Sequence, residues 1–136
     1  MKTTADTVPR DDVRARWDTN AAFWDERMGE GNAFHLHLVE PAALELIQLE
    51  PQERILEIAC GNGQFARKLA SLGARVTATD FSPAMIERAR AHTEPFNNQI
   101  EYRVADATDE NALRALGAHA FDAIVSNMAL MDISDI

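Results

Sequence analysis

The strongest constraint on the fold is a regular alternation, starting at residue 54, between short apolar runs and amphipathic segments. We expect each apolar run to form a strand, at residues 54–59, 74–80, 100–106 and 121–130, the last of which runs into a loop. The intervening segments have the apolar spacing or the capping residues of helices, at residues 63–73, 82–92 and 109–117. Strands that alternate with helices favour right-handed crossovers and a parallel sheet. The sequence therefore predicts an α/β fold in which helices cover a parallel sheet.

The first 50 residues stand outside this alternation. Apolar side chains recur at spacings of four, four and three, which predicts a helix over residues 11–28: Val13, Trp17, Ala21 and Trp24. A second helical stretch, residues 33–49, is expected to divide near Pro41. We interpret residues 1–50 as a helical cap beside the sheet. Trp17 and Trp24 are expected to pack between the cap and the sheet.

The composition narrows the class of ligand. The chain has 136 residues, which suits one domain, and a net charge of −9, with its 13 Lys and Arg residues scattered. Because binding to nucleic acid needs clustered positive charge, the sequence argues against nucleic acid and favours a small ligand. No apolar run reaches the roughly 18 residues of a membrane span, and the N-terminus lacks the apolar centre of a signal peptide.

Cysteine and histidine give little sign of a metal site. The single cysteine, Cys60, excludes an internal disulfide and fits a reducing, cytoplasmic setting. We interpret it as a small turn residue rather than a nucleophile. The histidines show no metal-ligand pattern: His35, His37, His92 and His119. His35 and His37 lie in the predicted cap, where one of them could reach a substrate.

Polar or small residues follow each predicted strand, and in a parallel sheet these carboxyl ends form one ligand-binding edge. After the first strand, Gly61 and Gly63 can adopt positive φ and let the backbone approach a ligand. Asp80 ends the second strand 17 residues past Gly63, close to the spacing of about 20 at which an acid binds ribose hydroxyls. Further polar residues end the third and fourth strands: Asp106, Ser126 and Asn127. The alternatives are that Asp80 only caps the next helix and that Asp106 is a solvated turn acid.

The segment GNGQFA also matches the G-x-G-x-x-G/A fingerprint of dinucleotide-binding folds, through Gly61, Gly63 and Ala66. Glu57 argues against a dinucleotide because its charge, four residues before Gly61, would repel a pyrophosphate. A ligand with an ammonium or sulfonium group would instead be attracted. Asp106 supports the same choice, since it can accept a hydrogen bond from an exocyclic amine. The residues favour a cationic nucleoside, with an NAD-binding domain as the weaker alternative.

Four segments, in order and at the right spacing, resemble the successive motifs of class I S-adenosylmethionine-dependent methyltransferases: ILEIACGNGQFARKLA, VTATDFSPAMIERAR, YRVADAT and FDAIVSNMALMDI. The resemblance runs from about residue 54 to the end, and the N-terminal helices are similar to the family's substrate-side cap. It implies a Rossmann-like, three-layer fold with strand order 3-2-1-4-5-7-6, of which this chain holds about four strands. Residues 51–136 would then be an S-adenosylmethionine-binding domain that is truncated at its C-terminus.

The resemblance also implies where the cofactor binds. The loop under its methionine part would consist of Glu57, Ala59, Gly61, Asn62 and Gly63. The ribose and adenine would meet residues after the second and third strands, with Asp80 on the ribose diol, Phe81 and Met85 near the adenine, and Asp106 and the Ala107 N–H at its amino group. The sulfonium and the substrate entrance would lie near Asn127 and Met128. Ala59 departs from the family pattern, which often has a glycine there.

These residues predict an S-adenosylmethionine-dependent methyltransferase that acts on a small-molecule acceptor by proximity and orientation. We assign no catalytic residue and no metal, because such chemistry need not use a protein nucleophile or a metal. The alternative is a truncated, non-catalytic S-adenosylmethionine-binding or interaction module. The fourth strand would form an apolar sheet edge, which predicts pairing with a second copy or with a completing chain.

Overall fold

The sheet is parallel and has the expected strand order. A computed structural model describes residues 10–135, and its strands lie in the order β3-β2-β1-β4. Their bounds are Arg54–Ile58 for β1, Arg75–Asp80 for β2, Ile100–Val104 for β3 and Ala123–Val125 for β4. β1 pairs in parallel with both β2 and β4. The predicted α/β fold is confirmed, and the order matches the first four strands of the family pattern.

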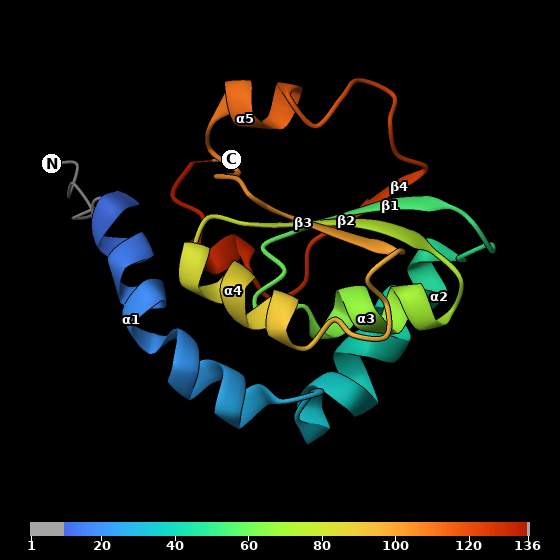
Figure 1. Ribbon diagram of the computed structural model, residues 1–136, viewed down its shortest axis with the longest axis horizontal. Coiled ribbons are helices and arrows are strands. Elements are labelled where there is room, and N and C mark those ends of the chain that lie inside the picture. The colour runs from blue at the N-terminus through green and yellow to red at the C-terminus, as the bar shows by residue number, and fades with distance from the viewer. Residues whose placement is uncertain (1–9, 136) are drawn as a thin grey trace, which may run out of the picture.

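Helices cover both faces of this sheet (Figure 1). One face carries α3 (Gln64–Ser71) and α4 (Pro83–Ala91), and the short α5 (Glu110–Arg114) lies on the other. Ser82 caps α4, because its hydroxyl accepts a hydrogen bond from the Met85 N–H at 3.1 Å. The predicted helix start at Ser82 is therefore confirmed.

The core lies between the two central strands and the helices α3 and α4. Ile55, Leu69 and Val76 are at most 2% exposed and belong to one cluster of buried apolar side chains. β1 reads as an apolar run interrupted by Glu57, and three of its five residues are buried. This packing fixes the strand register and brings the carboxyl ends of the strands to the same edge.

The N-terminal helices flank the sheet. α1 (Arg10–Met28) runs beside the carboxyl ends of the strands and packs on α4 (Figure 1). A π-helical turn, η1 (His35–Val39), leads directly into α2 (Glu40–Ile47), so the second helical stretch divides where it was expected to. Residues 1–9 of the predicted cap lie outside the described residues. Within residues 10–135, no helix is long and apolar enough to cross a membrane.

The largest difference from the sequence prediction concerns the end of the chain. β4 has three residues, Ala123–Val125, within the segment 121–130 that was expected to be a strand running into a loop. β4 lies at the edge of the sheet and pairs with β1 on one side. The chain turns away from the sheet at Met128, whose φ is +54°. A 3-10 turn, η2 (Leu130–Asp132), follows. The apolar pattern alone could not show where an edge strand loses its partner.

Candidate functional site

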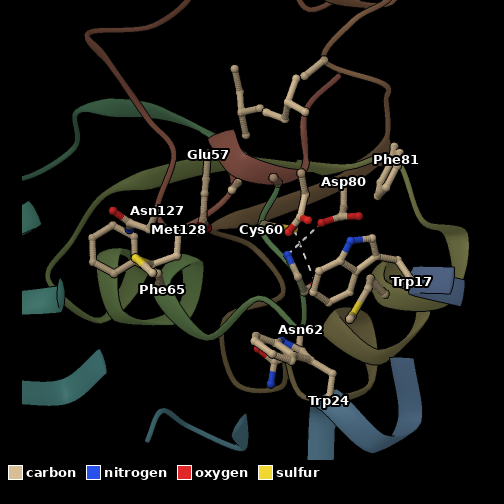
Figure 2. Close-up of a pocket in the computed structure, with 18 of the residues that line it drawn as sticks. Trp17, Trp24, Glu57, Cys60, Asn62, Phe65, Asp80, Phe81, Asn127 and Met128 are labelled. Carbon is tan, nitrogen blue, oxygen red and sulfur yellow. Dashed lines mark hydrogen bonds between the residues drawn. The ribbon is translucent and has the colours of Figure 1, made fainter. Parts of the chain in front are cut away.

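The strand ends open into a cavity of about 440 Å³, with α1 forming one of its walls (Figure 2). Most of the predicted site residues line this cavity: Glu57, Ala59, Gly61, Asn62, Asp80, Phe81, Met85, Asp106, Ala107, Asn127 and Met128. Gly63 is not among the lining residues. The structure therefore brings residues from four separate strand ends to one place.

The loop after β1 is held by the acid at the end of β2. One carboxylate oxygen of Asp80 accepts a hydrogen bond from the Gly61 N–H and the other from the Ser82 N–H, both at 2.9 Å. Burial raises the pKa of Asp80, and these N–H donors oppose the rise. Gly61 has a φ of +56° and Ala59 has a φ of +57°, a region that disfavours side chains. Asp80 thus shapes the loop and lines the cavity at once.

The second glycine of the loop is required for packing. Gly63 has a φ of +76°, and a Cβ there would overlap the hydroxyl of Tyr102 on β3 and lie 3.0 Å from the Ala89 Cβ. A Cβ at Gly61 would meet nothing closer than the Trp24 Nε1 at 3.8 Å. From the sequence, we expected both glycines to let the backbone approach a ligand. The structure instead shows that Gly63 lets the start of α3 pack closely on β3 and α4.

Glu57, on the central strand β1, is buried with part of its hydrogen-bonding capacity unused. Its side chain is 3% exposed and lines the cavity, and its Oε2 has no hydrogen-bond partner among residues 10–135. Burial raises the pKa of Glu57 to about 8, and the charge of Asp80 adds to the rise, while Arg67 and the Ala66 N–H oppose it. A cationic ligand group beside Glu57 would favour the ionised carboxylate.

Asp106, after β3, is tied to the cap. Its Oδ2 lies 3.5 Å from Nη2 of Arg14 on α1, and its Oδ1 accepts hydrogen bonds from the N–H and hydroxyl of Thr108 at 2.8 and 2.7 Å. The side chain is 13% exposed, which argues against a solvated turn acid. α1 therefore reaches across to the end of the third strand.

The β4 end of the cavity has polar side chains whose hydrogen-bonding capacity is not fully used. Ser126 Oγ and Asn127 Nδ2 are both buried without a hydrogen-bond partner in the described part of the chain. Figure 2 shows Asn127 and Phe65 toward one end of the cavity, and Asp80 and Phe81 toward the other. The cavity thus has two distinct ends, one beside β4 and one beside β2.

The sequence analysis treated Trp17 and Trp24 as packing residues of a substrate-side cap, and in the structure both also line the cavity. Four side chains of α1 line the cavity: Val13, Trp17, Trp24 and Met28. The rings of Trp17 and Trp24 meet edge to face, with centroids 5.3 Å apart. The apolar stripe on this helix was visible in the sequence as a packing surface. The pattern could not show that the stripe faces a cavity.

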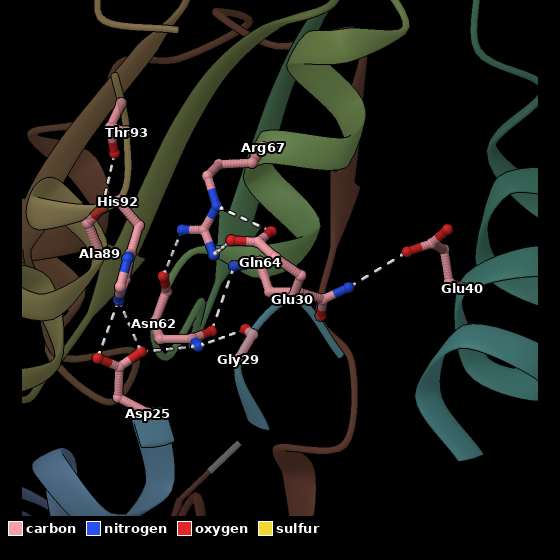
Figure 3. A network of polar contacts seen from close by, with 10 residues as sticks. All are labelled: Asp25, Gly29, Glu30, Glu40, Asn62, Gln64, Arg67, Ala89, His92 and Thr93. Carbon is pink, nitrogen blue, oxygen red and sulfur yellow. Dashed lines mark hydrogen bonds and ion pairs between the residues drawn. The ribbon is translucent and has the colours of Figure 1, made fainter. Parts of the chain in front are cut away.

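Polar contacts tie α1 to the glycine loop (Figure 3). Asp25 Oδ1 accepts a hydrogen bond from Asn62 Nδ2 at 3.1 Å, and both Asp25 oxygens lie within 3.0 Å of His92 Nε2. Burial raises the pKa of Asp25, but the contacts with His92 and Asn62 outweigh it and lower the pKa overall. Asn62 also donates to the Gly29 carbonyl at 2.9 Å. These partners are up to 67 residues apart, so no local pattern announced them.

A family model of methyltransferase domains matches residues 55–136, more than half of the chain. The chain belongs to the class I S-adenosylmethionine-dependent methyltransferases. The ubiquinone biosynthesis O-methyltransferase of Xanthomonas axonopodis pv. citri (strain 306) is 35% identical over 116 residues, which are 83% of this chain and 46% of the relative. This methyltransferase domain spans about half the length of the curated relatives it matches.

Solved structures agree with this assignment. The DhpI–SAH complex is 26% identical, with a TM-score of 0.59 over 90% of this chain and 54% of that one. The magnesium protoporphyrin IX methyltransferase of Synechocystis PCC 6803, solved with bound SAM, has a TM-score of 0.68 over 93% of this chain and 64% of that one. At 17% identity, the second likeness shows the fold alone.

Thiol and metal chemistry find no support in this methyltransferase domain. Cys60 is buried, and burial raises the pKa of its thiol well above the usual range, so it stays protonated at neutral pH. Among residues 10–135, no three His, Cys, Asp or Glu side chains are grouped so that they could hold a metal ion.

Proposed function

We propose that this domain binds S-adenosylmethionine in the cavity and transfers its methyl group to a hydroxyl oxygen of a small molecule. Glu57 is the observation that carries the proposal. A buried carboxyl whose Oε2 has no partner in residues 10–135 is costly unless a ligand completes it. A positively charged group is the ligand that such an acid binds best. Family membership supplies a cofactor that carries such groups.

The β2 end of the cavity suits the nucleoside. Asp80 holds Gly61 and Ser82 with one hydrogen bond per oxygen, which leaves acceptor capacity on its carboxylate for a ribose diol. Phe81 and Met85 line the same cavity and offer apolar surface to an adenine ring. Asp106, with the Ala107 N–H beside it, would bind the adenine edge. These assignments extend the roles expected from the sequence.

The β4 end suits the transfer itself. When bound, S-adenosylmethionine would supply a methyl carbon that an oxygen nucleophile can attack, with the neutral thioether sulfur as the leaving group. The chain's task is to orient the acceptor and exclude water, and alignment of this kind can lower a barrier by roughly 7–11 kcal/mol. Asn127 offers a buried amide donor there, and Phe65 adds an apolar ring at the same end (Figure 2).

The acceptor class follows from charge and from the relatives. A net charge of −9 disfavours a nucleic-acid acceptor. Several relatives that are 31–35% identical over 116 residues are ubiquinone biosynthesis O-methyltransferases, which supports an oxygen atom of a small molecule as the acceptor. We assign residues 1–50 to a substrate-side cap, residues 51–136 to cofactor binding, and the protein to the cytoplasm.

Isothermal titration calorimetry tests the proposal. S-adenosylmethionine and its demethylated product should bind the wild-type chain, and NAD should not. Because Glu57 is largely protonated at pH 7, binding should release protons, which two buffers of different ionisation enthalpy will report. Glu57→Gln should weaken binding about 10- to 100-fold, the cost of one hydrogen bond to a charged group. NAD binding without S-adenosylmethionine binding would refute the proposal.

A further inference from the structure

His35 is a second buried group in the cavity with unused hydrogen-bonding capacity. It is the first residue of η1, is 6% exposed and lines the cavity. Its Nε2 has no hydrogen-bond partner among the described residues. Its backbone N–H donates to Asn32 Oδ1 at 2.9 Å, which fixes the start of the turn. A buried ring nitrogen held in this way calls for a ligand group to complete it.

The neighbours of His35 place it at the end of the cavity where transfer would occur. Its ring meets Phe65 edge to face, with centroids 6.5 Å apart and an interplanar angle of 77°. Phe65 lies toward the Asn127 end of the cavity and away from Asp80 (Figure 2). If Asp80 binds the ribose, as proposed above, the methyl group lies toward Asn127 and therefore toward His35.

We propose that His35 is the general base for the acceptor hydroxyl, an inference that rests on the proposed function. The acceptor oxygen forms a bond to the methyl carbon while the sulfur–methyl bond breaks, and the electron pair of that bond stays on sulfur. The hydroxyl proton moves to Nε2 of His35. The imidazolium that forms then releases this proton to water. Charge balances, because one sulfonium is lost and one imidazolium is gained.

The surroundings of His35 suit a neutral base. Burial lowers its pKa, and the charge of Glu40 on α2 opposes part of this effect. Two further acids line the same cavity, Glu57 on β1 and Asp132 on η2. Burial outweighs the nearby acidic charge, so the net pKa of His35 is lowered and the imidazole is neutral at pH 7. Its Nε2 accepts a proton when the ring hydrogen is on Nδ1. Such a base contributes typically 10²–10⁴-fold to a rate.

The walls near His35 indicate the class of acceptor. The ring of Phe65 meets the His35 ring, and further aromatic or thioether side chains line the same cavity: Trp24, Met28 and Phe34. Flat apolar walls of this kind bind aromatic rings, which pack edge to face or offset against them. We therefore assign the acceptor hydroxyl to an aromatic ring, for which phenol is the simplest probe.

Methyl transfer from labelled S-adenosylmethionine to phenol tests the assignment. His35→Gln should lower the rate at least about 100-fold at pH 7 and remove the rise of the wild-type rate with pH through the His35 pKa. The affinity for S-adenosylmethionine should change less than about twofold. His37→Gln is the matched control, because His37 is exposed on the same turn and does not line the cavity. Equal rates for the wild type and His35→Gln would overturn the assignment.

A second measurement needs no turnover. In the chain saturated with S-adenosylhomocysteine, phenol should shift the NMR signal of the His35 ring, and the midpoint of its pH titration should move. Anisole, which has the same ring but no hydroxyl proton, should leave that midpoint in place. A His35 signal that does not respond to phenol would overturn the assignment. Failure of the wild type to bind S-adenosylmethionine would instead contradict the proposed function.

Discussion

The two halves of the cavity differ in whether their polar groups already have partners. On the β2 half, Asp80 accepts two backbone N–H groups and Asn62 is held by Asp25 and Gly29. On the other half, polar atoms are buried without partners in residues 10–135: Glu57 Oε2, His35 Nε2 and Asn127 Nδ2. The chain completes the first half by itself, and the second half is completed by what binds there.

This difference teaches which substitutions cost stability and which cost binding. Removing a group that has native partners leaves those partners unsatisfied and destabilises the fold. Removing a buried group without a partner relieves a cost that the folded state carries. Substitutions in the two halves should therefore change the free energy of unfolding in opposite directions. The following experiments test that contrast.

The largest expected effect is a gain of stability at Glu57. The pKa of Glu57 is about 8 in the folded state, above its ordinary value of 4.5, so between these two pH values the folded state binds more protons than the unfolded state. The free energy of unfolding should therefore fall as the pH rises, by up to about 1.4 kcal/mol per pH unit. Glu57→Gln should remove this fall and be the more stable protein at pH 9. Denaturant unfolding at pH 5, 7 and 9 measures it, and parallel curves for the two proteins would contradict it.

A loss of stability is expected next, at Gly63. An added Cβ is strained at a φ of +76° and overlaps the Tyr102 hydroxyl, so Gly63→Ala should lower the free energy of unfolding by about 3 kcal/mol or more. Gly61→Ala meets no such overlap and should cost about 1 kcal/mol. Urea unfolding of both variants gives the comparison. When Tyr102→Phe is added to each variant, part of the lost stability should return in Gly63→Ala and none in Gly61→Ala. An equal loss at both glycines would show that packing on Tyr102 is unimportant.

Asp25 should show a smaller loss. Asp25→Ala leaves Asn62 and His92 without their shared acceptor, and the free energy of unfolding should fall by about 1–2 kcal/mol. The pKa of Asp25 is lower in the folded state than its ordinary value of 3.8. The ionised carboxylate therefore stabilises the fold above pH 3.8, and this stabilisation is lost as the pH falls through the folded-state pKa. Cofactor affinity should also fall, since the loop is less well ordered. Glu26→Ala, on the exposed face of the same helix, is the control and should change neither quantity.

The smallest effect is expected at the β4 edge. Ile124 is 64% exposed on β4, so Ile124→Lys should change the free energy of unfolding by less than about 0.5 kcal/mol. It should nevertheless reduce self-association, which an exposed apolar strand edge promotes. Light scattering over a range of concentrations measures this. Val104→Lys, at the end of β3 on the opposite edge, should not change it. A wild-type chain that stays monomeric throughout would contradict the expectation.

Much of the fold could be predicted from local sequence. The short apolar runs indicated β1, β2 and β3, and the resemblance to the family implied their order in the sheet. Ser82 and Pro83 marked the start of α4 through local capping chemistry. The point within residues 121–130 at which β4 ends could not be predicted, because an edge strand ends where pairing ends, and pairing is not a property of the strand's own residues.

The site was predicted less completely, for a related reason. Glu57, Asp80 and Asp106 could be found because each follows or lies in a strand whose end the topology places. The reason for glycine at position 63 could not, since it depends on Tyr102, a residue 39 positions away. Asp25 was missed in the same way, because helical periodicity reports which face is apolar and not which distant amide a polar residue meets.

The hydrogen bond between Asn62 and Asp25 has a practical consequence for protein engineering. A shortened protein that starts just before β1 would keep every residue at the strand ends. It would nevertheless lose the carboxylate and the Gly29 carbonyl that anchor the Asn62 amide. The smallest unit with a correctly shaped loop therefore begins at α1, and α1 belongs in any miniaturised version made for screening ligands.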